Sequence, residues 1–295
     1  MRNFLFEQYG YYPKNIINDC FEISGWKFKL IEVDINEEEV NSIVEYTKIL
    51  TNVFHNKGPF VIKNKAGNNV SVLKNKNYVL VSVILGSMNF QDIVKFHSLF
   101  FKDDEYIELD KILSAWKNRV DDIEKKLNSY LRMDSIYYKN NLDISVFCIG
   151  LAINAMQYLS DIIYNYDNKL YGVSIVHKRL SNLDSFDFFN PFNFMVEHPL
   201  KDICGLYQSH YITFEEFKSL LSNYHLDKKS ATFLLARLLY RQDIFDVIEN
   251  KRDLDEGDQQ IKFNFEKEMH KIKKAYAFLK ETYSIRPIDW LEEHP

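Results

Sequence analysis

The strongest constraint on the fold is a change in the hydrophobic pattern near residue 90. Before this point apolar residues mostly alternate as in strands, with one helical pattern at residues 36–53. After it, most apolar residues recur every three or four positions, which is typical of helices. Strands at one end of a chain and helices at the other indicate an α+β fold. We therefore predict a sheet-plus-helix lobe over residues 1–88 and a helical lobe over residues 89–295.

The first lobe has clear local signals. Two strand-like runs, residues 16–24 and 26–34, are separated by Ser24-Gly25, which predicts a hairpin turn. Asn36 precedes a helical pattern with three acidic residues in its first turn, so we expect it to cap a helix. The second strand places Trp26, Phe28 and Leu30 on one face and Lys27, Lys29, Ile31 and Val33 on the other.

The second lobe reads as a series of helices. Residues 110–131 have an apolar stripe, and residues 144–163 are apolar almost all round, as expected of a helix buried within a lobe. We expect no uncharged apolar run in the chain to approach roughly 18 residues, the length that a membrane-spanning helix needs. Residues 171–200 look irregular, and residues 251–260 read as a polar loop.

Composition excludes several classes of protein. The net charge is -5 and cations are not clustered, which argues against a dedicated nucleic-acid binder. Cys20, Cys148 and Cys204 are far apart, so neither a disulfide framework nor a zinc site is indicated. The N-terminus lacks the apolar run of a signal peptide, so we expect an intracellular protein.

Sequence motifs for common chemistry are absent. The nine glycines are too far apart to form a phosphate-binding P-loop or a G-x-G-x-x-G loop. There is no H-E-x-x-H, EF-hand or G-x-S-x-G motif either. Any chemistry must therefore come from side chains that the fold brings together.

Several segments, in order, carry a family resemblance; they include "GLAINAMQYLSD", "SIVHKRLSNLD", "FFNPFNFMVEHPLKDICGLY" and "LLARLLYRQDIFDVIE". The chain resembles, over nearly its whole length, the kinase-like spore coat-associated proteins of endospore-forming bacteria, within the choline kinase and aminoglycoside phosphotransferase-like superfamily. The resemblance implies a bilobal protein-kinase-like fold, with a small antiparallel sheet and a helix in the N-terminal lobe and a larger, mainly helical C-terminal lobe.

The resemblance also implies where catalytic groups would lie. Phosphotransferases of this superfamily carry His-Gly-Asp before a loop that ends in Asn. Here His177 matches the His, Lys178 stands at the Gly and Arg179 stands at the Asp. A guanidinium stays charged near pH 7 and cannot accept a proton from a substrate hydroxyl. The catalytic position is therefore degenerate.

The metal-binding positions are no better preserved. Asn182 and Asp184 both fall near the magnesium-binding Asn, and Glu197 is the carboxylate nearest to the later metal-binding Asp. These three residues are the candidates for metal ligands, because Mg²⁺ prefers oxygen donors. Asp202 matches a structural Asp that follows Pro in this superfamily.

The phosphate-binding lysine has also been replaced. Ile31 falls at its position, and Lys29 lies on the same strand face about 6–7 Å away. Lys29, Lys178 and Arg179 are thus the candidates for binding a nucleotide or another anion.

Two interpretations of the loop stay open. In one, His177 is bonded behind the loop, and Lys178 and Arg179 are exposed or paired with Asp184 or Asp187. In the other, these three residues form a cationic patch that binds an anion. The phenylalanines around Pro191 would either fill the cleft side of the helical lobe or form a docking surface for other coat proteins.

Loss of the glycine loop, the lysine and the catalytic Asp together favours a pseudokinase, a structural or assembly component of the bacterial spore coat. We then expect no phosphotransferase activity, no cofactor and no nucleic-acid or membrane partner, but contacts with other coat proteins. The resemblance places such a protein in the mother-cell cytoplasm and then in the coat. The alternatives are a phosphotransferase acting on a small-molecule hydroxyl, with ATP and Mg²⁺ and with Asp184 and Glu197 as unusual catalytic groups, or a nucleotide- or anion-binding sensor.

Overall fold

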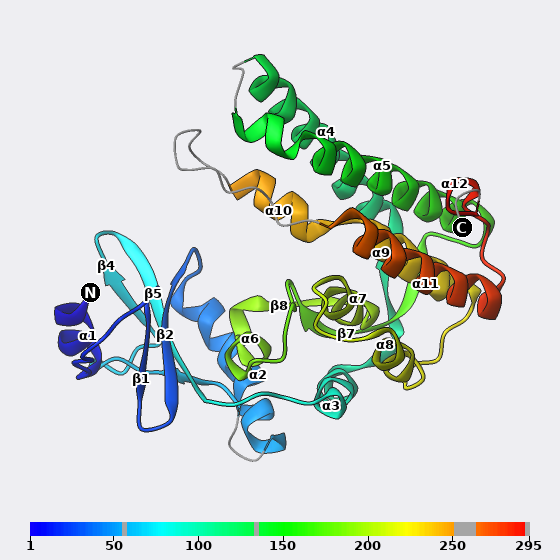
Figure 1. Cartoon of the computed structure of the whole chain (residues 1–295). Helices are drawn as coiled ribbons and strands as arrows, with labels where there is room; N and C mark the ends of the chain where they lie inside the picture. Colours follow the sequence, from blue (N-terminus) through cyan, green and yellow to red (C-terminus); the bar gives the residue numbers. More distant parts are fainter. Residues whose placement is uncertain (55–57, 133–135, 251–263, 293–295) are drawn as a thin grey trace. The chain divides into compact units, whose positions relative to one another are not determined.

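The computed structural model describes residues 1–54, 58–132, 136–250 and 264–292 (Figure 1). It divides into two compact units. The first contains Met1–Leu99 and Ile175–Val196, and the second contains Phe100–Ser174 and the residues from Glu197 onward. These units differ from the predicted lobes of 1–88 and 89–295, because residues 89–99 and a segment from the middle of the chain belong with the sheet.

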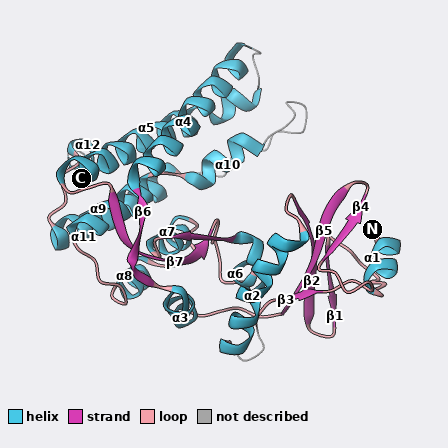
Figure 2. Ribbon diagram, turned by 180° about the vertical axis from the view of Figure 1, so that it is seen from behind, coloured by secondary structure: helices cyan, strands magenta, loops and turns pink. Residues whose placement is uncertain are grey.

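The first unit is built on an antiparallel sheet with the strand order β1-β2-β5-β3, and β4 also pairs with β5 (Figure 2). Its strands are β1 (Cys20–Ile23), β2 (Trp26–Val33), β3 (Phe60–Ile62), β4 (Val70–Leu73) and β5 (Lys76–Ile84). Ser24 and Gly25 form the turn between β1 and β2, and both have a positive φ, as two-residue hairpin turns of this kind require. The predicted hairpin is confirmed.

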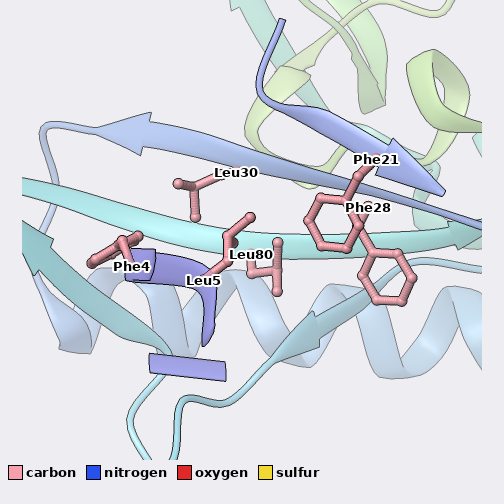
Figure 3. Close-up of a cluster of buried hydrophobic side chains, with 6 residues drawn as sticks. All are labelled: Phe4, Leu5, Phe21, Phe28, Leu30 and Leu80. Carbon is pink, nitrogen blue, oxygen red and sulfur yellow. The ribbon is translucent and has the colours of Figure 1, made fainter. Parts of the chain in front are cut away.

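One face of this sheet is covered by α1 (Arg2–Tyr9), a helix that we did not expect. Phe4 and Leu5 of α1 pack with Phe28 and Leu30 of β2 in a buried cluster that Figure 3 shows, together with Phe21 and Leu80. Because side chains alternate along a strand, the intervening residues of β2 point to the opposite face.

The opposite face is covered by α2 (Glu37–Val53), so α1 and α2 lie on opposite sides of the sheet (Figures 1 and 2). Asn36 caps α2 and forms a reciprocal pair of hydrogen bonds with Glu39, which confirms the predicted cap. The carboxylate of Glu37 accepts hydrogen bonds from the backbone N–H groups of Asn69 and Val70, both at 2.8 Å. These bonds attach the start of α2 to the loop before β4.

Four further elements lie wholly or almost wholly in the first unit: α3 (Phe90–Phe100), α6 (Ser185–Phe189), the short 3-10 helix η1 (Pro191–Asn193) and β8 (Phe194–Glu197). The last residues of α3 and β8, Phe100 and Glu197, belong to the second unit. The last residues of β7 (Lys169–His177) also belong to the first unit. Segments separated by about a hundred residues in the sequence therefore share one core.

The second unit is mainly helical. Its elements are β6 (Lys102–Glu108), α4 (Leu109–Arg132), α5 (Ile136–Asn165), the first part of β7, α7 (Leu200–Gln208), α8 (Phe214–Leu221), α9 (Lys228–Leu239), α10 (Gln242–Asn250), α11 (Phe265–Tyr283) and α12 (Asp289–Glu292). β6 pairs antiparallel with β7, from Lys102 opposite Val173 to Glu108 opposite Lys169. The loop predicted over residues 251–260 lies outside the described residues. A sheet-plus-helix unit and a mainly helical unit confirm the predicted α+β fold class.

α5 differs from the prediction in two respects. Its residues 144–160 carry no charge, and within the described residues Asn141–Asn165 is long and apolar enough to cross a membrane. The expectation that no apolar run approaches this length was therefore wrong. The helix is also not buried all round, because Val146 is 58% exposed and Ile153 is 44% exposed. Its other faces pack against α4 and α9. A helix in a protein core can be equally long and apolar, so the length and apolar character of α5 are weak evidence for a membrane span.

Candidate functional site

His177 is the last residue of β7 and is almost completely buried. Its Nε2 atom is 2.7 Å from the carbonyl oxygen of Phe188, and its ring stacks on Phe96 with 5.0 Å between the ring centroids. Phe194 packs edge-on against the same imidazole. These contacts hold the ring behind the loop.

Lys178 and Arg179 follow at the surface, and both are exposed. The side chain of Asn193 holds the main chain of Arg179 by accepting from its N–H at 3.2 Å and donating to its carbonyl oxygen at 2.6 Å. The ammonium of Lys178 donates to the carbonyl oxygen of Phe192 at 3.1 Å. The structure thus places both cations side by side on one loop that η1 supports.

Asn182 and Asp184 shape the turn that leads into α6. The side-chain oxygen of Asn182 accepts from the N–H of Asp184 at 2.7 Å, and its amide nitrogen donates to Asp187 at 2.9 Å. Asp184 in turn caps α6 by accepting from the N–H of Phe186 at 2.9 Å. Within the turn, Asn182 therefore uses its side-chain oxygen and Asp184 uses one of its two carboxylate oxygens.

The segment from Leu183 to Ser185 is hydrogen-bonded to the end of β5 and to the residues that follow it. Ser185 donates from its hydroxyl to the carbonyl oxygen of Ile84 at 2.7 Å and from its N–H to that of Gly86 at 3.0 Å. The N–H of Met88 donates to the carbonyl oxygen of Leu183 at 2.8 Å. The backbone carbonyl groups of Ile84 and Gly86 and the N–H group of Met88 are therefore already hydrogen-bonded to this segment of the chain.

Phe186 lies beneath two lysines of β2. The ammonium groups of Lys27 and Lys29 are 5.6 Å and 5.4 Å from the centroid of its buried ring, a distance at which cation–π attraction operates. Lys27 also lies 3.8 Å from the carboxylate of Asp184. Lys29 is one of the predicted anion-binding residues, whereas Lys27 was not predicted to have this role. Lys27 lies two residues earlier on the same strand face, and this spacing could have indicated that both lysines lie close to the same ring.

A buried aromatic cluster continues from Phe186 into the unit. Phe188 and Phe189 are fully buried and pack against Phe54, which follows α2, and Phe188 also contacts Phe96. Phe192 and Phe194 are half-buried. Most phenylalanines around Pro191 thus belong to the core of the first unit. The expectation that they fill the helical lobe was wrong, because this segment packs against the end of α2 and against α3 of the sheet unit.

Glu197 and Asp202 belong to the second unit. Glu197 forms an ion pair with Arg237 of α9, and both side chains are buried. Arg237 in turn lies over the rings of Phe233 and Trp116. Asp202 is 1% exposed in the first turn of α7. Burial raises the pKa of Tyr224, and the charge of Asp202 adds to this shift.

No group of three or more His, Cys, Asp or Glu side chains that could hold a metal ion exists among the described residues. The predicted ligands Asn182 and Asp184 lie in the first unit and Glu197 lies in the second.

A cavity of about 580 Å³ lies within the first unit. It is an open cavity lined by the end of β2 and the residues after it, by α2, by Ile175 and Lys178, and by the chain from Asn190 to Val196. Ile31, which stands at the predicted lysine position, is one of its lining residues. Sequence reasoning did not find this cavity, because its walls come from distant parts of the chain.

Comparison with known families gives a match over residues 2–282 to the family described as "Spore coat putative kinase YutH". No curated protein matches the chain.

Several solved structures are similar to this chain at low sequence identity. An aminoglycoside phosphotransferase from Alicyclobacillus acidocaldarius is 11% identical, with a TM-score of 0.49 over 89% of this chain and 85% of that one. A spectinomycin phosphotransferase in complex with ADP and spectinomycin is 10% identical, with a TM-score of 0.48 over 94% and 92% of the two chains. A choline kinase from Streptococcus pneumoniae is 12% identical, with a TM-score of 0.31 over 89% of each.

Proposed function

The chain belongs to the spore coat YutH family of kinase-like proteins, and we propose that it is a catalytically degenerate member that acts as a structural or assembly component of the spore coat. Its partners are then other coat proteins, rather than nucleic acid or a membrane, and it requires neither ATP nor Mg²⁺. It would be made in the mother-cell cytoplasm and later become part of the coat.

The observation that carries this proposal is the position of Phe186 beneath Lys27 and Lys29. Lys29 is the residue best placed to replace the missing phosphate-binding lysine, and its ammonium faces an aromatic ring of its own chain. Ser185, the preceding residue, uses the carbonyl oxygens of Ile84 and Gly86. A nucleotide would have to displace this packing and these bonds before it could bind here.

The predicted catalytic and metal-binding residues support the same conclusion. Arg179 cannot act as a general base, because it stays protonated. Asp184 caps a helix and lies near Lys27, and Glu197 is paired with Arg237. Each carboxylate already has a partner within its own unit, and this supports the absence of a magnesium site. We therefore derive no phosphoryl-transfer step for this chain.

A nucleotide- or anion-binding sensor is the second candidate function. It is favoured by the exposed side chains of Lys178 and Arg179, which stand next to each other on a loop fixed by Asn193. Two adjacent cations attract phosphate or carboxylate groups without a metal ion. No observation in the described residues favours the phosphotransferase acting on a small-molecule hydroxyl.

Thermal unfolding of the purified chain with ATP, ADP or GTP, each with Mg²⁺ and with a chelator, tests the proposal. A ligand at a hundredfold over its Kd would stabilise the fold by about 2.7 kcal/mol. We expect no shift of the midpoint with any nucleotide. A shift that needs Mg²⁺ would overturn the proposal in favour of an enzyme. A shift that is independent of Mg²⁺ and is lost in Arg179→Ala would establish the sensor instead.

A further inference from the structure

The antiparallel sheet of the first unit ends in an edge strand. β1 pairs with β2 on one side, and no other strand in the described part of the chain pairs with its other side (Figure 1). An edge strand presents backbone N–H and C=O groups to which another extended chain can bond. The groups of β1 that point outward therefore decide what this edge can bind.

The register of the β1–β2 hairpin identifies these groups. Ile23 and Trp26 flank the two-residue turn and form a hydrogen-bonded pair. Hydrogen-bonded and non-hydrogen-bonded pairs alternate along antiparallel strands, so Cys20 and Glu22 turn their backbone N–H and C=O groups away from β2. Cys20 agrees with this direction, because its N–H and C=O are bonded to Ile17, at 2.9 Å and 3.0 Å. The backbone N–H and C=O of Glu22 have no hydrogen-bond partner among the described residues.

A cavity of about 600 Å³ lies beside this edge. It is lined by all four residues of β1, by Lys27 of β2 and, from the segment before β1, by residues 12–15 and Ile17. Tyr12 is 64% exposed and Ile17 is 72% exposed, so the cavity is open to solvent and offers large apolar side chains. Its volume lies within the range of pockets that accept a ligand. We call this cavity the edge groove.

Free charge in the edge groove is divided between β1 and the segment before it. The carboxylate of Glu22 and the ammonium of Lys14 are exposed, and neither forms an ion pair with a described residue. The ammonium of Lys27, by contrast, lies 3.8 Å from the carboxylate of Asp184. A complementary occupant therefore places a cation beside Glu22 and a carboxylate beside Lys14. Because directly opposite side chains of paired strands interact, the cation belongs on the residue that pairs with Glu22.

We propose that the edge groove binds an extended peptide segment of a partner protein, which adds a strand to β1. The basic residue opposite Glu22 exchanges two backbone hydrogen bonds with it, and the apolar residues next to it in the peptide lie against Tyr12 and Ile17. Main-chain pairing gives the affinity and the side chains give the selectivity. The inference rests on the proposed assembly function and deepens it by naming the chemistry of a partner.

A second copy of this chain fits the edge groove less well. Two β1 strands paired antiparallel at Glu22 would place two Glu22 carboxylates directly opposite each other, and like charges in this position destabilise the pairing. A peptide with a basic residue at this position meets no such repulsion. The charge of one side chain thus distinguishes the two occupants.

Variants of Glu22 separate backbone pairing from charge. Glu22→Pro removes the N–H that points away from β2 and leaves the bonds between β1 and β2 in place, and Pro is tolerated in edge strands in this orientation. Glu22→Lys is the matched control, because it keeps the N–H and reverses the charge. Methylation of one backbone nitrogen in the peptide makes the same test of main-chain pairing on the native chain, whether or not the Pro variant folds.

The probe is the fluorescein-labelled peptide Thr-Val-Lys-Val-Glu, and fluorescence anisotropy measures its affinity. We expect saturable binding to the native chain. Affinity should fall about tenfold when the backbone nitrogen of the peptide lysine is methylated, and by a similar factor in Glu22→Pro, because each change removes one hydrogen bond of the pair. Glu22→Lys should prefer the same peptide with glutamate in place of lysine. Bound peptide should also slow the reaction of Cys20 with a thiol reagent, since Cys20 lines the edge groove.

A native chain that does not bind the peptide would overturn this inference. Equal affinity for the methylated peptide would also overturn it, because recognition would then not involve main-chain pairing. An unchanged reaction rate of Cys20 would do the same by placing the peptide elsewhere. A native chain that dimerises, with Glu22→Pro staying monomeric, would assign the edge to a second copy instead. None of these outcomes bears on the degenerate kinase site, because the nucleotide shifts test that separately.

Discussion

Glu197, the last residue of β8, forms an ion pair with Arg237 of α9, and both side chains are more than nine-tenths buried. The resemblance places a metal-binding carboxylate near Glu197. A guanidinium fixed against this carboxylate neutralises the charge that would otherwise attract Mg²⁺. The pair therefore uses, within the second unit, a carboxylate that a metal site at this position would need.

Removing one partner of this pair should be costly. Arg237→Ala leaves Glu197 as a buried, uncompensated charge, so we expect the free energy of unfolding to fall by about 3–5 kcal/mol. Chemical denaturation of the native chain and the variant measures this difference. The double variant Glu197→Leu with Arg237→Met removes both charges and should be close to native stability. Equal losses in the single and double variants would show that packing, rather than charge, dominates.

A carboxylate placed at position 179 should produce neither nucleotide binding nor activity. Arg179→Asp supplies a general base at the predicted position, but Ile31 still stands at the lysine position and Phe186 still lies beneath Lys29. We expect neither a Mg²⁺-dependent thermal shift with ATP nor ATP hydrolysis above the level of the native chain. A clear gain of hydrolysis would show that Arg179 was the only barrier to catalysis, and a thermal shift without hydrolysis would show that the packing of Phe186 does not prevent nucleotide binding.

Local signals in the sequence were sufficient for much of the first unit. The helix cap at Asn36 and the hairpin turn at Ser24-Gly25 each depend on residues that are three or fewer positions apart. Both could therefore be predicted from the local sequence. Strand alternation likewise indicated that Phe28 and Leu30 share a face. By contrast, α1 has little amphipathic pattern, and its place is set by contacts of Phe4 and Leu5 with strands further along the chain.

The candidate site was predictable only in part. Lys178, Arg179 and Asp184 could be placed on one loop from the resemblance. The partner of Glu197 lies forty residues away along the chain, and the ring that Lys29 faces lies still further. Local sequence patterns carry no information on such pairs, because tertiary packing decides them. Residues 175–196 were not predicted to belong to the sheet unit, because tertiary packing also decides where this segment lies.

The three cysteines should differ in reactivity. Burial raises the pKa of Cys148 to about 12 and also raises that of Cys204, so neither forms a thiolate near neutral pH. Cys20 is half-buried, and its pKa is raised by burial while Lys29 and Lys27 oppose the shift. We expect a thiol reagent at pH 8 to modify one cysteine slowly in the native chain and three after denaturation.

The substitution Cys20→Ser provides the control for this labelling. The native form of this variant should not react at all, and its denatured form should show two thiols. Reaction of two or more thiols in the native chain would mean that the cores of the second unit open readily on the time scale of labelling.

Lys271 should make the stability of the second unit depend on alkaline pH. Burial lowers its pKa to about 8, with Glu268 opposing the shift, and its ammonium donates to the carbonyl oxygen of Tyr207. An unfolded lysine has a pKa of about 10.4, so between these values the unfolded chain binds more protons than the folded one. The free energy of unfolding therefore rises with pH between these two pKa values. Below a pH of about 8 the folded chain carries the buried ammonium, so the full cost of burying this charge is present there. Denaturation of the native chain and of Lys271→Met from pH 7 to 10 checks the sign: the native chain should gain stability relative to the variant as the pH rises. A constant difference would show that the ammonium remains charged throughout.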